Sequence, residues 1–530
     1  MNPLQLRRFS MLTHFTKKDA NSVPLGVSGR RNSSPLPLPH RTIPELKGQD
    51  LDFVNVAHSH LIHTDWAKLN VLASGLTPFR IKHILLKIQK DHVLSLEFFD
   101  WVKLQRPNSY TLETHSIILH ILTKAKRFAI AESLLKKTVI PKTINSASEL
   151  FDSVLYSYRL CDSSPRVFDS LFKTYAHMKK FRNATDTFRR MKEYGFLPTI
   201  ESCNAYMSSL LDLHRTDIVL AFYREMSHCQ ISPNVYTLNM VISALCKSGK
   251  LEKAIEMFKE MENMGCRPTV ATFNTLIVGH SNQGLLSSAM KLKTTMPKNG
   301  LHPNVVTYNI LIHGFCKEGK LHDANKLFSE MKAMDVKPNT VTYNTLINGY
   351  SQMNNSEMGS RLYEEMIRNG VAVDILTYNA LILGLCKEGK TKKASSLVKE
   401  LNRQDLIPNA STFSALIGGQ CKRQNSERAF QLYKSMKKNG CHPNTDTFKI
   451  LISTFSKNED FGGAVQVLWE MLERSMAPDA AVLTELFEGL CRRGKTDMAM
   501  RLCMELEGRH LLPDGFDKVS IIGFQSQTVT

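Results

Sequence analysis

The sequence predicts an all-α protein, an α-solenoid superhelix built from helix-turn-helix hairpin repeats. Three observations predict this class. A unit of 35 residues recurs ten times without an insertion over residues 165–514, apolar residues inside each unit follow helical spacing, and Pro stands at the end of nine of the ten units. A chain of 530 residues is too long for one ordinary core. Stacked repeats reach that length because each unit buries a face only against its neighbours.

The first 45 residues predict a segment that precedes the fold. Residues 1–18 contain Arg7, Arg8, Lys17 and Lys18 and no acidic residue. An organellar import peptide has this composition because it must form a basic amphipathic helix; an unprocessed disordered tail is the alternative. The Arg pair favours the mitochondrial matrix, with the chloroplast stroma as the alternative compartment. The Pro-rich stretch at residues 35–39 predicts an extended linker.

Residues 46–164 predict a helical region in which the repeat has decayed. Units 77–111 and 112–146 keep the rhythm weakly, through Leu96, Phe98 and Ala131. Residues 147–164 are then an irregular insertion that breaks the register. Terminal repeats are commonly atypical because one of their faces meets solvent.

Each regular unit predicts two helices. In the unit that starts at Val305, apolar residues recur with helical spacing from Tyr308 to Phe315 and again from Leu321 to Met331, with a turn between the two runs. The recurring Met is more typical of core filling than of ligand binding. Residues 515–530 are a C-terminal tail. The ten units begin at Pro165, Ile200, Val235, Val270, Val305, Thr340, Ile375, Ala410, Thr445 and Ala480.

Charge and cysteine usage restrict the function. The net charge of +19 favours a polyanionic partner. No apolar run is long enough to cross a bilayer, so we expect no membrane association. The eleven cysteines include five at one equivalent position of the repeat, and no C-x-x-C pair occurs. We therefore expect free buried thiols in a reducing compartment, and neither a metal nor another cofactor.

Two positions of the unit are polar where packing does not require it. The fifth residue lies on the first helix among core residues, and it is Asn in six consecutive units although Asn is a poor helix former. The last residue of the unit, which follows the terminal Pro, is Asn, Asp or Thr. Helix capping explains this last residue but not the Asn on the helix itself.

These residues identify a resemblance. The chain resembles the pentatricopeptide repeat family, whose unit has 35 residues and a signature close to VTYNTLI…LCK.G…A..LF..M…G..P[ND]. The resemblance is strong over residues 165–514 and weak over residues 77–146. A tetratricopeptide unit of 34 residues would lose register within a few repeats. The resemblance implies binding of single-stranded RNA, one nucleotide per repeat, with the fifth and last residues of each unit reading the base edge.

Carried onto this sequence, the resemblance implies three sets of site residues. The base-reading residues are Asn204, Asn234, Asn239, Thr269, Asn274, Asn304, Asn309, Asn339, Asn344, Asp374, Asn379, Asn409, Ser414, Asn444, Thr484 and Asp514. The base-stacking residues, second in their units, are Tyr236, Ala271, Val306, Val341 and Leu376, and Glu201, Ser411 and Asp446 depart from this apolar pattern. The phosphate-facing residues are Lys247, Lys317, Lys387, Lys422, Lys457 and Arg492, for which ordinary helix C-terminal charge is the structural alternative.

The family's pairing of the fifth and last residues also implies which base each unit binds. Asn344 with Asp374 resembles the combination for U, Ser414 with Asn444 that for A, and Thr484 with Asp514 that for G. Pairs of Asn with Asn, and Asn239 with Thr269, imply a pyrimidine. Asp169 with Thr199 and Lys449 with Asp479 match no combination. Read 5′ to 3′ along the chain, the implied site is N-Y-Y-Y-Y-U-Y-A-N-G.

The sequence therefore predicts a non-enzymatic, sequence-selective binder of an organellar transcript. It would act as a monomer in RNA stabilisation, processing, splicing or translation, with RNA-processing or splicing proteins as candidate partners. A deaminase would need H-x-E with C-x-x-C, and a metallonuclease a carboxylate cluster, in an added domain. We expect neither after the last repeat. A protein-binding α-solenoid, acting as a scaffold or as an adaptor for an RNA-processing enzyme, remains the alternative.

Overall fold

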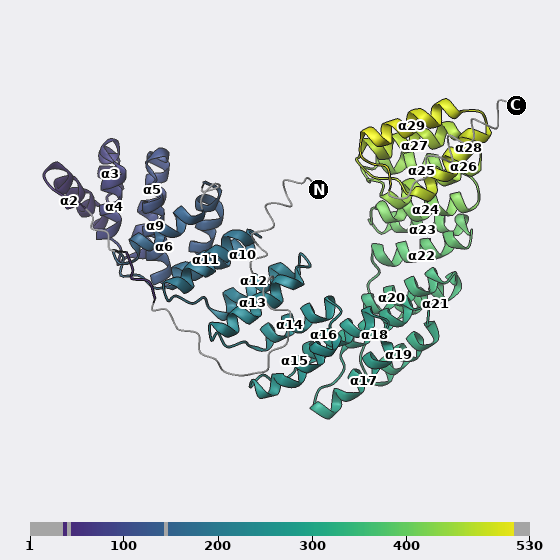
Figure 1. Cartoon of the computed structure of the whole chain (residues 1–530), viewed down its shortest axis with the longest axis horizontal. Coiled ribbons are helices and arrows are strands. Elements are labelled where there is room, and N and C mark those ends of the chain that lie inside the picture. The colour runs from purple at the N-terminus through teal and green to yellow at the C-terminus, as the bar shows by residue number, and fades with distance from the viewer. Residues whose placement is uncertain (1–34, 40–43, 143–146, 514–530) are drawn as a thin grey trace. The chain divides into compact units, whose positions relative to one another are not determined.

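The structure is a computed structural model that describes residues 35–39, 44–142 and 147–513. Most of the expected targeting segment and the expected tail at residues 515–530 lie outside these residues. Every regular element of the described residues is a helix, and none of these helices is long and apolar enough to cross a membrane. The chain divides into two compact units, Met1–Gly279 and His280–Thr530. Figure 1 shows the order of the helices along the chain. The prediction of an all-α solenoid of helical hairpins is confirmed.

The hairpins follow the register of the sequence. Nine of the ten first helices begin at the first residue of their unit, and α10 begins one residue later. The first helices are α10 Arg166–His177, α12 Ile200–Leu211, α14 Val235–Lys247, α16 Val270–Asn282, α18 Val305–Lys317, α20 Thr340–Gln352, α22 Ile375–Lys387, α24 Ala410–Lys422, α26 Thr445–Lys457 and α28 Ala480–Arg492. The second helices are α11 Phe181–Glu193, α13 Thr216–His228, α15 Leu251–Asn263, α17 Leu286–Thr295, α19 Leu321–Ala333, α21 Ser356–Arg368, α23 Thr391–Arg403, α25 Ser426–Lys438, α27 Phe461–Glu473 and α29 Thr496–Gly508. A short 3₁₀ turn, η5 Pro297–Asn299, follows α17.

Polar side chains fix where the first helices start. At α20, the Asn339 side chain accepts a hydrogen bond from the Thr342 N–H, and the Thr342 hydroxyl accepts one from the Asn339 N–H. This reciprocal capping box satisfies two backbone N–H groups that the helix leaves without intrahelical partners. The same capping box begins five other first helices, at Asn234, Thr269, Asn304, Asp374 and Asn409.

Close packing between successive first helices explains the repeated cysteines. The tenth residue of several units is Gly, and it faces the Cys or Ser at the twelfth place of the unit before. A Cβ atom added at Gly419 would lie 2.7 Å from Cys386 Cβ, and one added at Gly384 would lie 2.6 Å from Ser351 Oγ. All eleven cysteines are free, and burial raises the pKa of the Cys386 thiol to about 12. These thiols therefore pack as small apolar side chains between repeats.

Hydrogen bonds from tyrosines join the two helices of a hairpin. The fourth residue of several units is a buried Tyr, and its hydroxyl donates to a Glu on the second helix of the same unit. The contacts are Tyr308–Glu330 at 3.1 Å, Tyr343–Glu365 at 3.0 Å and Tyr378–Glu400 at 3.2 Å. Lys332 of the preceding hairpin forms an ion pair with Glu365 at 2.7 Å. The same carboxylate thus contacts both its own hairpin and its neighbour.

The N-terminal region is helical as well. Its elements are α2 Gln49–Ile62, α3 Trp66–Leu72, η2 Ala73–Gly75, α4 Pro78–Lys87, α5 His92–Gln105, η3 Pro107–Ser109, α6 Leu112–Lys124, α7 Phe128–Leu134, the π-helical η4 Leu135–Val139, α8 Ile140–Lys142 and α9 Ala147–Tyr158. Helix α9 fills the first part of residues 147–164, where we expected an irregular insertion that breaks the register. The buried Leu150, Phe151, Val154 and Leu155 have helical spacing but lie off the 35-residue register.

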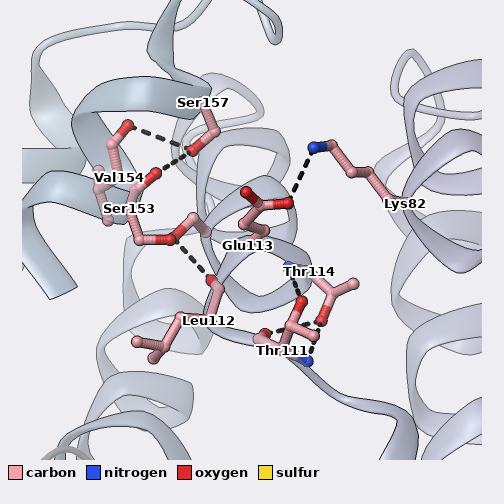
Figure 2. Close-up of polar contacts among 9 residues, drawn as sticks. Lys82, Thr111, Leu112, Glu113, Thr114, Ser153, Val154 and Ser157 are labelled. Atoms are coloured by element: carbon pink, nitrogen blue, oxygen red, sulfur yellow. Dashed lines mark hydrogen bonds and ion pairs between the residues drawn. The ribbon is translucent and has the colours of Figure 1, made fainter. Parts of the chain in front are cut away.

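Polar contacts hold α4, α6 and α9 together (Figure 2). Lys82 forms an ion pair with Glu113 at 2.8 Å, and the hydroxyls of Ser116 and Ser153 lie 2.9 Å apart. Behind these contacts, the fully buried His120 contacts the Ser163 hydroxyl through Nδ1 at 2.6 Å and the Val154 carbonyl through Nε2 at 2.9 Å. Since its ring has polar partners at both nitrogens, His120 is a structural residue of this region.

We predict that replacing Gly419 by Ala destabilises the fold, because the new methyl group would overlap the Cys386 side chain. Overpacking of this kind costs about 1–3 kcal/mol of unfolding free energy. The adjacent Gly418→Ala is the matched control, since the nearest atom to its Cβ is Ile450 Cδ1 at 4.0 Å. Ala in a helix should stabilise that site by about 0.5–1 kcal/mol. Urea unfolding measures both values, and equal effects would contradict the close contact.

We also predict that His120 makes the fold sensitive to mild acid. Burial lowers the pKa of its imidazole from 6.5 to about 4, so the folded state keeps the ring neutral while the unfolded chain takes up a proton. Its contribution to stability is complete above pH 6.5 and is lost as the pH falls towards 4, by up to about 3 kcal/mol. Thermal unfolding of the His120→Gln variant between pH 7.5 and 4.5 should show a shallower decline than the parent. Parallel curves would contradict this role.

Candidate nucleic-acid interface

A groove runs along the first helices α18, α20, α22, α24 and α26. It has a volume of about 1130 Å³, and its lining residues come from these helices, their caps and the turns that follow them. None of these lining residues lies on a second helix. The lining includes residues of all three predicted sets: the base-reading Asn344, Asp374, Asn379, Ser414 and Asn444, the stacking Val341 and Leu376, and the cationic Lys317, Lys387 and Lys422. The fold thus gathers polar, apolar and cationic positions along one surface.

The fifth and last residues of a unit meet at the junction with the next unit. The last residue caps the following first helix, and this places it beside the fifth residue of the helix before. In four units the Nδ2 atom of the fifth residue donates to Oδ1 of the last residue. The pairs are Asn204–Asn234 at 3.3 Å, Asn309–Asn339 at 3.2 Å, Asn344–Asp374 at 2.9 Å and Asn379–Asn409 at 3.1 Å.

A threonine of the next unit completes each of these four junctions. Its hydroxyl donates to the Oδ1 atom of the fifth residue. The contacts are Thr237–Asn204 at 2.7 Å, Thr342–Asn309 at 2.7 Å, Thr377–Asn344 at 2.6 Å and Thr412–Asn379 at 2.6 Å. Sequence reasoning missed this residue. The signal was the Thr that stands third in seven consecutive units, from Thr237 to Thr447.

Asp374 introduces a negative charge at its junction. Burial by itself raises the pKa of the carboxyl group, but hydrogen bonds from the Thr377 N–H, the Asn344 amide and the Thr377 hydroxyl outweigh burial and lower that pKa. Asp374 is therefore ionised at neutral pH. The Thr377 N–H and the Asn344 amide contact Oδ1, each at 2.9 Å, and the Thr377 hydroxyl lies 3.0 Å from the same atom.

Other junctions depart from this arrangement. Asp169 accepts hydrogen bonds from the N–H and hydroxyl of Thr199, at 2.8 and 3.0 Å, and burial raises its pKa despite them. Lys449 pairs with Asp479 at 3.0 Å. In the third repeat, where Thr269 is the last residue, Asn239 Oδ1 is buried and has no hydrogen-bond partner among the described residues.

The remaining base-reading positions belong to three further units. Asn274 is buried on α16, and Asn304 caps α18. Ser414 contacts the Thr447 hydroxyl at 2.7 Å, while Asn444 caps α26. Thr484 is exposed on α28 and donates to the Ala480 carbonyl, and its expected partner Asp514 lies outside the described residues.

The positions expected to stack on bases are exposed. Val306, Val341 and Leu376 expose 53%, 56% and 60% of their surface, and Tyr236 exposes 55%. Ala271 is also exposed, as are the polar Glu201, Ser411 and Asp446 that stand at this place in other units. Large apolar side chains exposed at a fixed register of a solenoid mark a surface that can contact a ligand.

The expected phosphate-facing residues lie at the C-terminal ends of the first helices. Three of them donate to a carbonyl near the end of the preceding first helix: Lys247 to Leu211 at 3.5 Å, Lys387 to Gln352 at 3.3 Å and Lys422 to Lys387 at 2.5 Å. They thus satisfy the capping alternative, and Lys387 and Lys422 also line the groove. Lys317 is exposed, Lys457 lies 3.7 Å from Glu485, and Arg492 pairs with Glu488 at 3.0 Å.

The described residues contain no group of three or more His, Cys, Asp or Glu side chains that could hold a metal ion. Amide, hydroxyl, carboxylate and ammonium groups are among those that line the groove. Such groups exchange hydrogen bonds with the edges of a ligand and, at its cationic positions, neutralise anionic groups.

Comparison with known proteins gives matches along the repeats. The PPR repeat family profile matches residues 198–247, 233–282, 268–317, 303–345, 338–387, 373–422 and 408–457, and the PPR repeat profile matches residues 166–196, 446–476 and 483–511. Together these matches span more than half of the chain.

Individual relatives cover less of it. A mitochondrial pentatricopeptide repeat-containing protein of Arabidopsis thaliana is 65% identical over 195 residues, which are 37% of this chain and 37% of the relative. A second one is 31% identical over 165 residues, or 29% of this chain and 22% of the relative. The chain thus spans well under two thirds of either relative. The crystal structure of PPR10 from maize aligns with a TM-score of 0.49 and 19% identity over 91% of this chain and 77% of that one. On the profile matches, the chain belongs to the pentatricopeptide repeat family.

Proposed function

We propose that this chain binds single-stranded RNA in the groove, one base per junction, and selects its sequence without catalysis of its own. One observation carries the proposal. At consecutive junctions the fifth and last residues are held together by a hydrogen bond, and each keeps polar atoms that their mutual contacts do not use. Unpaired bases are recognised through hydrogen bonds to their edges, and a row of such junctions suits a linear polymer.

The orientation of the junction groups indicates which bases they fit. Asn344 Oδ1 faces Thr377, and one Nδ2 hydrogen faces Asp374, so the second Nδ2 hydrogen can donate to a pyrimidine carbonyl. Asp374 Oδ2 can accept the N3–H of uracil. At the neighbouring junction, Asn339 Oδ1 is engaged by the cap and by Asn309, which leaves Asn339 Nδ2 to donate to the unprotonated N3 of cytosine. The groove therefore favours U at the Asn344–Asp374 junction and C at the Asn–Asn junctions.

The rest of the surface supports this mode of binding. Exposed apolar residues at the second place, such as Val341 and Leu376, can pack between successive bases, since every base has an apolar face. The cationic ends of the first helices and the net charge of +19 favour the phosphate backbone. Glu201 and Asp446 stand at the second place of their units, and they would weaken the packing against bases there.

We further propose that the RNA is an organellar transcript. The N-terminus favours the mitochondrion because it contains Arg and few acidic residues. The names of both relatives, which describe mitochondrial proteins, favour the same compartment. A protein that occupies a single-stranded site can block an exonuclease, keep the site unpaired for translation, or guide splicing and processing. The proposed consensus is N-Y-Y-Y-Y-U-Y-A-N-G, bound by a monomer.

We predict that Asn339→Asp changes the base preferred at the fifth repeat from C to U. The substitution replaces an outward donor by an outward acceptor while the inward oxygen still caps α20. One hydrogen bond exchanged in this way is worth about 1–1.5 kcal/mol, or about tenfold in relative affinity. Unfolding free energy should stay within about 0.5 kcal/mol, because Asn and Asp are equivalent caps. Fluorescence anisotropy with ten-nucleotide RNAs that differ at the fifth base measures the change.

The control for the added charge is Asn425→Asp. Asn425 caps α25, a second helix, by accepting from the Arg428 N–H at 3.0 Å, and it does not line the groove. This variant should keep the parent's preference at every position. If Asn339→Asp keeps the preference for C, the proposed reading of bases by the last residue is wrong.

A further inference from the structure

We propose that the threonine at the third place of a first helix is a positioning residue, which fixes the orientation of the base-reading Asn in the preceding unit. This inference rests on the proposed function and adds a residue to it. The threonines concerned are Thr237, Thr342, Thr377 and Thr412, each of which contacts the fifth residue of the unit before. Base selection would then depend on three side chains of each junction, and one of them need not touch the RNA.

The hydrogen-bond geometry gives the hydroxyl one direction in which to donate. At α22, the Thr377 hydroxyl accepts from the Asp374 N–H at 3.3 Å, so its single hydrogen is left for another oxygen. The closer acceptor is Asn344 Oδ1 at 2.6 Å, and Asp374 Oδ1 lies at 3.0 Å. The same order holds at the other three junctions, where the distances to the Asn at the fifth place are 2.6–2.7 Å and those to the cap are 2.9–3.2 Å.

Burial makes this preference effective. All four threonines are fully buried, so water does not compete for the hydroxyl. A primary amide has an oxygen face and a nitrogen face of nearly equal size, and an Asn whose two faces both met water could present either one to a base. A buried hydroxyl that must donate its hydrogen can form this bond only with the amide oxygen. The nitrogen of the Asn is thereby directed to the cap and to the ligand.

The third repeat provides a natural contrast. Its cap is Thr269, and the Thr272 hydroxyl lies 3.2 Å from the Thr269 hydroxyl while it accepts from the Thr269 N–H at 3.1 Å. Asn239 Oδ1 is left without a hydrogen-bond partner among the described residues. Threonine at the third place is therefore not sufficient for the contact with the fifth residue. The contact also requires a cap that carries an amide or a carboxylate. In the last repeat Val482 stands at this place, so no hydroxyl is present beside Lys449.

The test compares Thr377→Val with Thr377→Ser and Thr272→Val in the full chain. Thr377→Val keeps the shape of the side chain and removes the donor. With ten-nucleotide RNAs that carry U or C at the sixth position, we expect Thr377→Val to lower the ratio of affinities for U over C at least fivefold, and Thr377→Ser to retain it. Thr272→Val removes the same backbone contact from its cap but no contact to Asn239. It should lose thermal stability as Thr377→Val does and leave the ratio at the third position unchanged.

The outcomes separate positioning from simple stability. A helix-capping role alone predicts weaker binding of both RNAs by Thr377→Val with an unchanged ratio, and that result would overturn the inference. A ratio equal to the parent's with unchanged affinity would overturn it as well. If the parent chain itself shows no difference between U and C at any position, the proposed function is wrong and the positioning role is lost with it.

Discussion

The hydrogen-bonded junction between successive repeats is the interaction on which the rest of the structure depends. At α20 and α22 one Asn or Asp side chain starts the helix, contacts the fifth residue of the helix before it and keeps a polar atom for the groove. Because the cap has to sit at the first turn of its helix, it can fix the position of the amide at the fifth place to within hydrogen-bond distance. Under the proposed function, structural and recognition roles would be combined in the same few atoms.

The spacing of these junctions depends on apolar packing behind them. Gly384 and Gly419 let successive first helices approach, and the buried Ser351 and Cys386 fill the space that remains. The tyrosine hydroxyls that reach Glu330, Glu365 and Glu400 then hold each second helix to its first. A linear polymer can be read only if its reader repeats at a regular interval, so under the proposed function this packing would set the distance between bases.

Much of this could be predicted from the sequence. The 35-residue period predicted the hairpins, and resemblance to a family selected Asn309, Asn344 and their partners. The role of Thr377 could not be predicted, because its partner Asn344 lies 33 residues earlier and the same letter also explains a capping box. The contact of Gly419 with Cys386 could not be predicted either, because the two residues lie 33 positions apart in the sequence. The bounds of helix α9 could not be predicted from the period, because α9 lies off the register.

The central claim is that each junction reads one base through its fifth and last residues. The most direct measurement is selection of RNAs by the purified full chain from a random single-stranded pool, followed by sequencing. We expect one enriched window in which U stands at the sixth of ten positions, pyrimidines fill the second to fifth and the seventh, and A stands at the eighth. Equal recovery of all four bases at every position, or enrichment of duplexes alone, would contradict it.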